Sequence, residues 1–176
     1  DEAELLSAVE RSRSMASRGF GDTEVYLERL IERPRHVEFQ ILGDAHGAAE
    51  HLFERDCSTQ RRNQKVIEEA PAPGIARARI EDMAENIAGI MRNMGYDNIG
   101  TVEMLYGADG SFSFLEMNTR LQVEHGVTEE VTGVDLVKAQ IRSAAGEKLA
   151  DILPAKIEVK GHAIQARVYA EDPRNF

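Results

Sequence analysis

The chain has 176 residues, of which 42% are apolar and 30% are charged, an ordinary composition for a globular domain or part of one. Its net charge of -10 argues against general nucleic-acid binding, and no apolar run approaches the ~18 residues that a membrane span needs. The single cysteine, Cys57, excludes an internal disulfide and suits a reducing cytoplasm or organelle matrix. The basic residues Arg55, Arg61, Arg62 and Lys65 lie close in the sequence, and such a local cluster suits a small anion.

The first third of the chain is predicted to hold one helix followed by strands. Apolar spacing predicts a helix over residues 3–18 that ends at Gly19. Alternating side chains predict a strand over residues 24–30 and another from residue 34, which turns back at residues 43–47. A donor-rich loop is expected over residues 56–65.

Two amphipathic helices are predicted in the rest of the chain. The first covers residues 75–94 and stops at Gly95. The second covers residues 134–145, and a strand is expected to end the segment 156–169, with Gln165 and Arg167 pointing away from Ile164 and Val168. The apolar faces of the helices are predicted to be Ile80, Met83, Ile87, Ile90, Met91 and Met94 in the first, and Leu136, Val137, Gln140 and Ile141 in the second.

Residues 101–106 and 112–118 are typical of a hairpin around the turn at residues 107–110. Glu103 and Glu116 are then expected to face each other, and like charges so close favour either a shared proton or a divalent cation. Asn118 adds a further oxygen ligand of the kind that hard cations take. Strict alternation places Phe112, Phe114, Glu116 and Asn118 on one face. A solvated hairpin face explains the two glutamates equally well.

Hairpin-connected strands mixed with helices favour an α+β fold, in which helices pack on one side of a mainly antiparallel sheet. A doubly wound parallel sheet is not expected.

The stretch that follows Glu103 is a dense row of polar groups, Glu116-Met117-Asn118-Thr119-Arg120-Leu121-Gln122-Val123-Glu124-His125. This stretch resembles the metal and bicarbonate site of biotin carboxylase, an ATP-grasp enzyme. The resemblance continues in family order through residues 54–65, 68–74 and 161–167 and covers essentially the whole chain. Two positions depart from the family pattern: Asn63 stands where a histidine is usual, and Gly126 where a proline follows the histidine.

The resemblance implies a partial ATP-grasp fold. Residues 1–31 correspond to the C-terminal part of the lid subdomain, and residues 32–176 to part of the C-terminal ATP-grasp subdomain. In the family a glycine-rich phosphate-covering loop and its lysine precede this region. The chain is therefore expected to be a fragment that is inactive by itself.

The activity implied is the ATP-dependent carboxylation of biotin by bicarbonate through carboxyphosphate, the first half-reaction of acyl-CoA and pyruvate carboxylases. Glu103, Glu116 and Asn118 are expected to hold Mg2+ or Mn2+. Glu124 is the expected base, Arg120 the bicarbonate ligand and Arg167 the group that stabilises negative charge on the biotin ring. The remaining nucleotide and bicarbonate contacts are expected from Glu28, Arg29, Ile31, His36, Gln60, Asn63, Lys65, Leu105, Gln122 and Val123.

The expected partners are a biotin carboxyl carrier protein or domain and a carboxyltransferase subunit or domain, in a homo-oligomeric protein of the bacterial cytoplasm or the mitochondrial matrix. The final carboxyl acceptor is not indicated. Other hypotheses are another ATP-grasp ligase, such as a carbamoyl-phosphate synthetase-like enzyme, and a nucleotide-binding module without catalysis. In a purely structural interpretation, Arg120 and Glu124 form a surface ion pair with each other.

Overall fold

The computed structural model describes residues 1–172 and 174, and the chain divides into two compact units, Asp1–Ile31 and Glu32–Phe176. The first unit consists of helix α1 (Glu2–Phe20) and an extended segment after it. Asp1 caps the helix by accepting a hydrogen bond from the Glu4 backbone N–H. The helix ends at Gly21, which has a left-handed φ of 73°, so the predicted end at Gly19 is wrong. The predicted strand over residues 24–30 is also wrong, because no described segment pairs with it.

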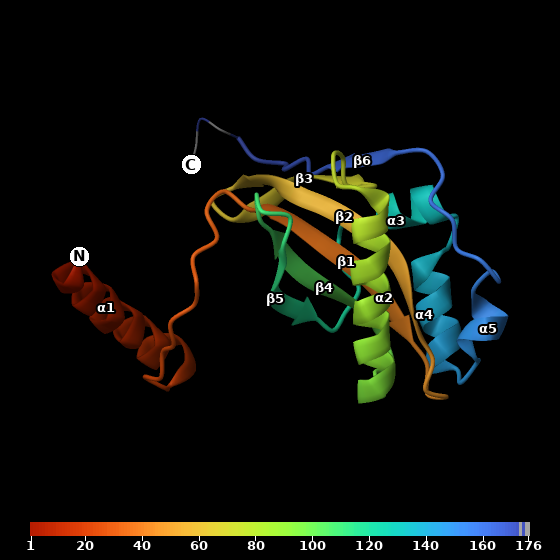
Figure 1. Cartoon of the computed structure of the whole chain (residues 1–176), viewed down its shortest axis with the longest axis horizontal. Helices are drawn as coiled ribbons and strands as arrows, with labels where there is room; N and C mark the ends of the chain where they lie inside the picture. The colour runs from red at the N-terminus through yellow and green to blue at the C-terminus, as the bar shows by residue number, and fades with distance from the viewer. Residues whose placement is uncertain (173, 175–176) are drawn as a thin grey trace. The chain divides into compact units, whose positions relative to one another are not determined.

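The second unit is built on a six-stranded sheet with the order β5-β4-β1-β2-β3-β6 (Figure 1). All neighbouring strands are antiparallel, which confirms the predicted α+β class. The strands are β1 (Arg35–Gly43), β2 (Ala49–Arg61), β3 (Gln64–Ala70), β4 (Ile99–Tyr106), β5 (Phe112–Asn118) and β6 (Ala163–Ala166), and the helices are α2 (Arg77–Met94), α3 (His125–Thr132), α4 (Leu136–Ala144) and α5 (Leu149–Ile152).

Helix α2 covers one face of the sheet and ends at Gly95, as predicted. Its buried side packs on an apolar strand face that includes Val37 and Phe39. The prediction that Ile90 and Met94 belong to this core is wrong, because they are 53% and 70% exposed. The buried stripe confirms the predicted Ile80, Ile87 and Met91 and adds two small residues, Ala84 and Ala88.

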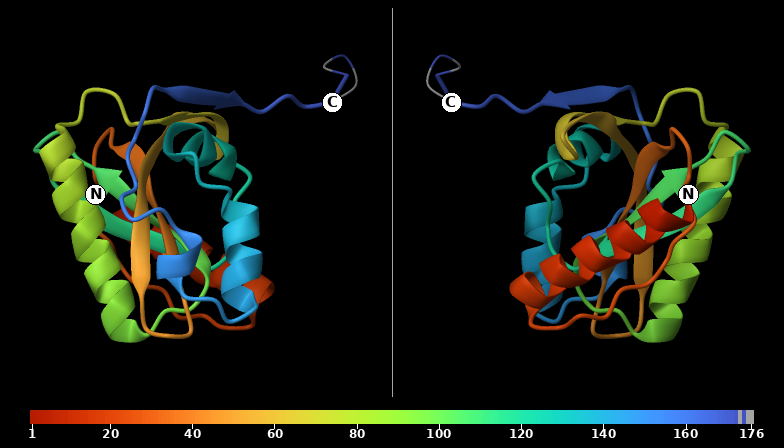
Figure 2. Two further views of the ribbon diagram at one scale, coloured as in Figure 1. Left: turned by 90° about the vertical axis from the view of Figure 1, so that its right-hand side faces the viewer. Right: turned by 90° about the vertical axis from the view of Figure 1, so that its left-hand side faces the viewer.

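Helices α4 and α5 pack on the opposite face of the sheet, so the prediction of helices on one side only is wrong (Figure 2). Leu42 and Ile99 lie on that face and need apolar cover, because α2 cannot reach them. In α4 the buried positions are Leu136, Ala139 and Ser143, whereas Ile141 is 65% exposed, contrary to the prediction.

The hairpin β2–β3 replaces the predicted loop over residues 56–65. Arg61 pairs with Gln64, and the two residues between them, Arg62 and Asn63, have φ of 52° and 62°. Two positive φ angles in a two-residue turn are typical of a type I′ hairpin, and asparagine tolerates this conformation well. The loop prediction failed because the polar side chains here belong to long strands.

Strands β4 and β5 pair Glu103 with Glu116, as predicted. The next pair is Met104 with Phe114, so Leu115 is an extra residue and forms a β-bulge. Phe114 therefore shares its face with Met104 and the α2 core, while Glu116 and Glu103 share the other face. The prediction that Phe114 and Glu116 lie on one face is wrong for this reason.

The predicted alternation at the end of the chain is confirmed around β6. Gln165 and Arg167 are half-buried, whereas Ile164 and Val168 are exposed. The regular strand is shorter than expected and covers four residues.

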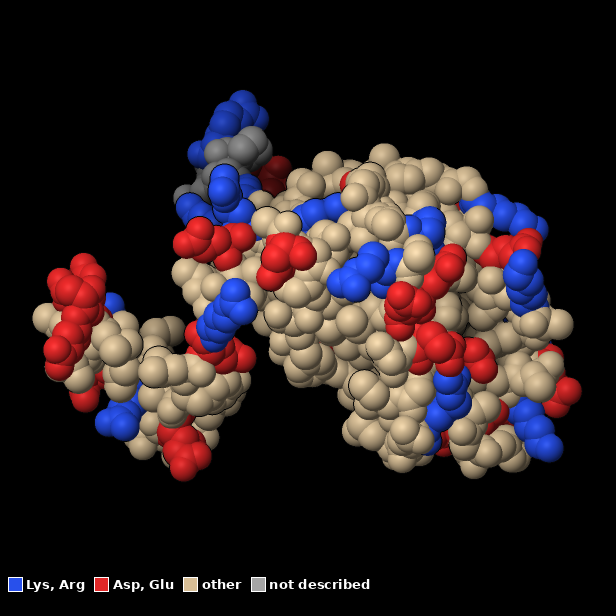
Figure 3. Space-filling model, viewed as in Figure 1, with Lys and Arg blue, Asp and Glu red and all other residues tan. Residues whose placement is uncertain are grey.

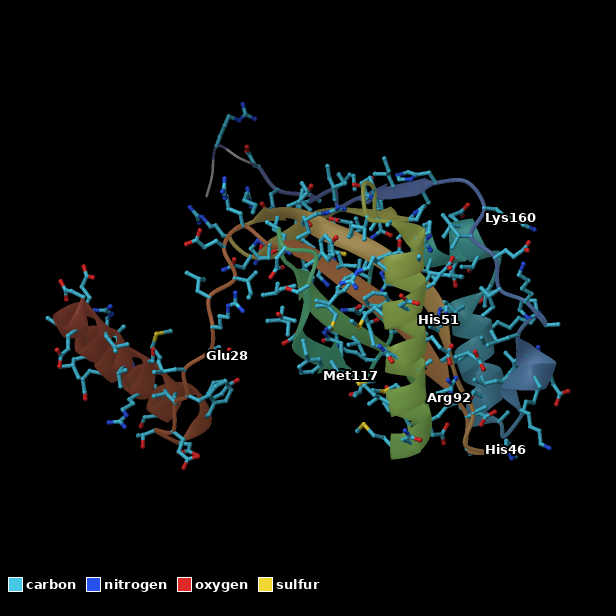
Figure 4. All side chains as sticks on the ribbon, viewed as in Figure 1. Glu28, His46, His51, Arg92, Met117 and Lys160 are labelled. Carbon is cyan, nitrogen blue, oxygen red and sulfur yellow. The ribbon has the colours of Figure 1, made fainter. Side chains whose placement is uncertain are left out.

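Acidic and basic side chains are mixed on the side of the second unit that carries α2 (Figure 3). His46 lies at the tip of the β1–β2 hairpin, and Arg92 joins α2 to β2 through a 2.9 Å hydrogen bond to the Ala49 carbonyl (Figure 4).

None of the described helices is both long and apolar enough to cross a bilayer.

Candidate active site

A cleft of about 810 Å³ lies on the sheet face that points away from α2. Every site residue predicted within residues 32–172 lines it. They are His36, Gln60, Asn63, Lys65, Glu103, Leu105, Glu116, Asn118, Arg120, Gln122, Val123, Glu124 and Arg167.

The three remaining predicted site residues, Glu28, Arg29 and Ile31, belong to the first unit. Glu28 and Arg29 are exposed and Ile31 is half-buried there. Their contact with adenine stays a prediction.

The centre of the cleft is Lys65, whose ammonium group donates to three carboxylates. Its Nζ lies 2.5 Å from Glu38, 2.8 Å from Glu103 and 2.7 Å from Glu124. Burial by itself lowers the pKa of Lys65, but the charge of Glu38 and the hydrogen bonds to the three carboxylates outweigh it and raise the pKa. Lys65 is therefore a fixed positive charge at neutral pH.

Polar side chains contact both oxygens of Glu103. Its Oε1 binds Lys65, Asn118 and Gln122, and its Oε2 lies 2.5 Å from His36 Nε2. Burial raises the pKa of Glu103, but the contacts with His36 and Lys65 outweigh burial and lower the pKa to about 2. The carboxylate is therefore ionised over the whole physiological range.

The predicted metal ligands converge on one wall of the cleft. Asn118 Nδ2 lies 3.0 Å from Glu103 Oε1 and 3.1 Å from Glu116 Oε1, so one amide spans both carboxylates. The Asn118 nitrogen points at the carboxylates and its Oδ1 accepts from Arg120, so the oxygen ligands that converge in this structure are the two carboxylates. Such a pair fits a hard divalent cation such as Mg2+ or Mn2+. His36 also approaches Gln60, with 2.8 Å between Nδ1 and Nε2, on the same side of the cleft.

Arg120 and Glu124 do not pair with each other, so the interpretation as a surface ion pair is wrong. Arg120 is exposed and donates to Asn118 Oδ1 at 3.0 Å. Glu124 is 2% exposed and its two oxygens accept from Lys65 and, at 3.0 Å, from Arg167. Arg167 also donates to the buried Glu68 at 2.6 Å.

Burial raises the pKa of Glu124, but the hydrogen bond and charge of Lys65 outweigh it and lower the pKa. Glu124 is the N-cap residue of α3, and its side chain makes no capping hydrogen bond. Its carboxylate therefore binds cleft residues, Lys65 and Arg167, and not the helix end.

Three buried charged residues of the site were missed from the sequence: Glu38, Arg55 and Glu68. Glu38 and Gln40 alternate with apolar residues, a pattern that usually marks a solvent-facing side, yet both are fully buried. The predicted basic cluster does not form, because Arg55 is buried, Lys65 lines the cleft, and Arg61 and Arg62 are exposed. The polar alternation in β1 was the one available signal.

An antiparallel sheet that gathers carboxylates, a lysine and arginines in a cleft on its open face is the arrangement of an ATP-grasp domain. The chain belongs to the family described as carbamoyl-phosphate synthase L chain, ATP binding domain, whose model matches residues 1–152.

Relatives of known name are carboxylases. The chain is 53% identical to a biotin carboxylase of Allochromatium vinosum over 99% of its length and 51% identical to pyruvate carboxylase 1 of Caenorhabditis elegans over 97%. It spans only 38% and 15% of those two proteins.

Solved structures of biotin carboxylases share the fold. A Campylobacter jejuni biotin carboxylase–βγ-ATP complex aligns with 100% of the chain at a TM-score of 0.91 and 41% identity, and the chain covers 39% of it. The biotin carboxylase domain of Hydrogenobacter thermophilus 2-oxoglutarate carboxylase, in complex with MgADP, ADP and bicarbonate, aligns with 99% at a TM-score of 0.90 and 44% identity, and the chain covers 38% of it.

Proposed function

We propose that this chain supplies the metal-, phosphate- and bicarbonate-binding part of a biotin carboxylase, which carboxylates biotin with bicarbonate and ATP through carboxyphosphate. The observation that carries the proposal is the convergence in one cleft of Lys65, the oxygen ligands beside Glu103, the Arg120–Glu124 loop and Arg167. The similarity to carboxylases over 99% of the chain supports the same activity.

Phosphoryl transfer from ATP needs neutralisation of negative charge. Glu103, Glu116 and Asn118 would hold Mg2+ or Mn2+, which when bound neutralises charge on the transferred phosphoryl group. Lys65 meets the phosphate side of the nucleotide with its fixed positive charge. His36, Gln60, Asn63 and Leu105 line the same cleft and would contact the nucleotide.

Bicarbonate is a planar anion that a guanidinium can bind with two hydrogen bonds. Arg120 is exposed and close to the metal ligands, so it supplies this contact, with Gln122 and the Val123 backbone beside it. Glu124 then accepts the bicarbonate proton. Because Lys65 and Arg167 bind both oxygens of Glu124 in this structure, its carboxylate becomes a stronger base when these two cations turn toward anionic substrates.

Arg167 lies at the other side of Glu124 and stabilises negative charge on the biotin ring, an oxyanion-hole role. The biotin arrives on a carrier protein or domain, and a carboxyltransferase subunit or domain consumes the product. We infer that the whole protein is homo-oligomeric and works in the bacterial cytoplasm or the mitochondrial matrix.

Residues 1–31 would form the end of the lid subdomain, with Glu28, Arg29 and Ile31 at the adenine. Residues 32–176 would form part of the C-terminal ATP-grasp subdomain.

A carbamoyl-phosphate synthetase-like ligase is the second candidate, favoured by the description of the matching family. The same metal ligands would serve it. Bicarbonate-dependent ATP hydrolysis that rises on addition of free biotin distinguishes the biotin carboxylase from this ligase.

Glu124→Gln tests the proposal in the complete protein that carries this chain. A general base contributes typically about 10²–10⁴-fold, so bicarbonate-dependent ATP hydrolysis should fall at least ~100-fold while MgATP still binds, as titration calorimetry would show. Glu130→Gln, an exposed residue of the same helix, is the matched control. Normal turnover by the Glu124 variant would remove this residue from the mechanism.

A further inference from the structure

Arg55 is fully buried at the base of the cleft and uses every N–H of its guanidinium group. Its Nε donates to Glu38 at 2.6 Å. The other four N–H groups donate to neutral side chains, namely Gln40 at 2.7 Å, Thr128 at 2.9 Å, and Thr101 and Gln122 at 3.1 Å.

These partners come from β1, β4, the loop before α3, and α3 itself. Burying a guanidinium group has a large desolvation cost, and well-packed apolar residues would stabilise such a position as well or better. Stability therefore does not explain why a charged group occupies this place. A fixed geometry does, because a planar fork with five donors holds its acceptors at set directions.

The contact with Gln122 determines how its amide is oriented. Arg55 donates to Gln122 Oε1, and Gln122 Nε2 donates to Glu103 Oε1 at 2.8 Å. A flipped amide would set its NH2 group against the guanidinium and its oxygen against a carboxylate. Both partners oppose the flip, so Gln122, which lines the cleft, is held with its NH2 group on the Glu103 side.

The contact with Thr128 holds the first turn of α3. Gln122 and Thr128 lie on either side of Glu124 in the sequence, and both are bound to the same guanidinium. The segment between them is thus fixed at two points on the buried floor of the cleft.

We propose that Arg55 is a positioning residue for bicarbonate: it clamps the segment Gln122–Thr128, which keeps the Gln122 amide as a hydrogen-bond donor and sets the place of Glu124. The inference rests on the proposed function. Arg55 does not line the cleft and acts only through these side chains.

Thr128→Val tests the clamp with the least change of shape, in the complete protein that carries this chain. The variant loses one acceptor of Arg55, and we expect the KM for bicarbonate in ATP hydrolysis to rise about tenfold, as for the loss of one hydrogen bond to a charged group. The KM for ATP should stay within about twofold, because Thr128 and Arg55 do not line the cleft and none of the proposed nucleotide contacts binds them. Thr128→Ser, which keeps the hydroxyl, should restore most of the bicarbonate affinity.

Ser143→Ala is the matched control. It removes another buried hydroxyl, which donates to the Gly43 carbonyl at 3.0 Å and lies in α4, away from the clamp. This variant should lose stability but keep the KM for bicarbonate. Arg55→Lys, which keeps the charge but not the five-donor fork, should raise the KM for bicarbonate at least as much as Thr128→Val.

Two results would overturn the inference: an unchanged KM for bicarbonate in Thr128→Val, or an equal rise in Ser143→Ala. Absence of any bicarbonate-dependent ATP hydrolysis in the unmodified protein would instead refute the proposed function. The two failures are therefore distinguishable.

Discussion

Lys65 holds three ionised side chains together in the cleft before a substrate binds. One ammonium group donates hydrogen bonds to three carboxylates that come from β1, β4 and the loop before α3, so it offsets only part of their negative charge. An incoming anion must compete with these carboxylates for Lys65, while an incoming cation can compete with Lys65 for Glu103. The cleft is thus matched to a ligand that brings both charges, such as a metal-bound nucleotide.

The low pKa of Glu103, about 2, has a consequence for stability in acid. A carboxyl group whose pKa is depressed in the folded state stabilises it above the unfolded-state pKa of about 4.5, and this contribution is lost as the pH falls toward 2. Its size is on the order of 3 kcal/mol. Glu103→Gln should therefore lower the free energy of unfolding at pH 7 and flatten its decline between pH 4.5 and 2.5.

Urea unfolding at a series of pH values measures this effect. Glu81→Gln, an exposed position on α2, is the control and should leave the pH dependence unchanged. The same pH slope in the Glu103 variant and the unmodified chain would contradict the assignment.

For single residues, the sequence predicted the side chains that line the cleft and missed the charged side chains buried beneath it. Arg120 and Glu124 lie in the stretch that resembles the biotin carboxylase site, and Glu103 precedes this stretch on the other strand of the hairpin. Arg55 and Glu38 are recognisable only through partners that are distant in the chain. Arg55 binds Thr101, which is 46 residues away, and Glu38 binds Lys65, which is 27 residues away. No local pattern reports on such contacts.

At the scale of elements, α2 shows why helical spacing alone does not define a buried face. Its stripe of large apolar residues is wider than the surface that the sheet offers, so Ile80 is fully buried and Ile90 is 53% exposed. Alanines at positions 84 and 88 allow the close approach of helix and sheet. A prediction that weights long apolar residues above small ones therefore places Ile90 in the core wrongly.

Ile80→Ala and Ile90→Ala form a matched pair on this helix. Removing a fully buried isoleucine should lower the free energy of unfolding by about 2–5 kcal/mol, whereas the exposed position should change it by less than ~1 kcal/mol. Chemical denaturation of both variants gives the comparison. Equal losses would mean that α2 packs on the sheet through a different face.

At the scale of the whole chain, the described apolar clusters all belong to residues 32–176. Helix α1 has no buried residue, and its leucines at positions 5 and 6 are 47% and 62% exposed. Most helical stability in proteins comes from packing of an apolar face, and α1 buries none. The second unit is therefore stabilised by apolar cores, whereas helix α1 of the first unit is not.

Deleting residues 1–31 should change the free energy of unfolding of the remaining chain by less than about 1 kcal/mol, because no described core residue is lost. Thermal unfolding followed by tyrosine absorbance in the sheet is the measurement. Loss of the cooperative transition would show that the second unit depends on the first.

The antiparallel class and the β4–β5 hairpin followed from turns and alternation, which are local signals. The helices on both faces, and the strand β6 beside β3, did not. These arrangements depend on which exposed faces need cover after the sheet has formed, and a linear pattern does not contain that information.

Because of the bulge at Leu115, the direction in which the Glu116 side chain points depends on an insertion in β5 but not on a deletion. Leu115 and Glu116 both line the cleft, although a regular strand sends successive side chains to opposite faces. Loss of Leu115 would leave the acidic side chain facing the same way and remove only an apolar neighbour. Gain of one further residue at this point would rotate Glu116 and Asn118 into the layer beneath α2. A deletion at position 115 is therefore compatible with the cation ligands, whereas an insertion there is not.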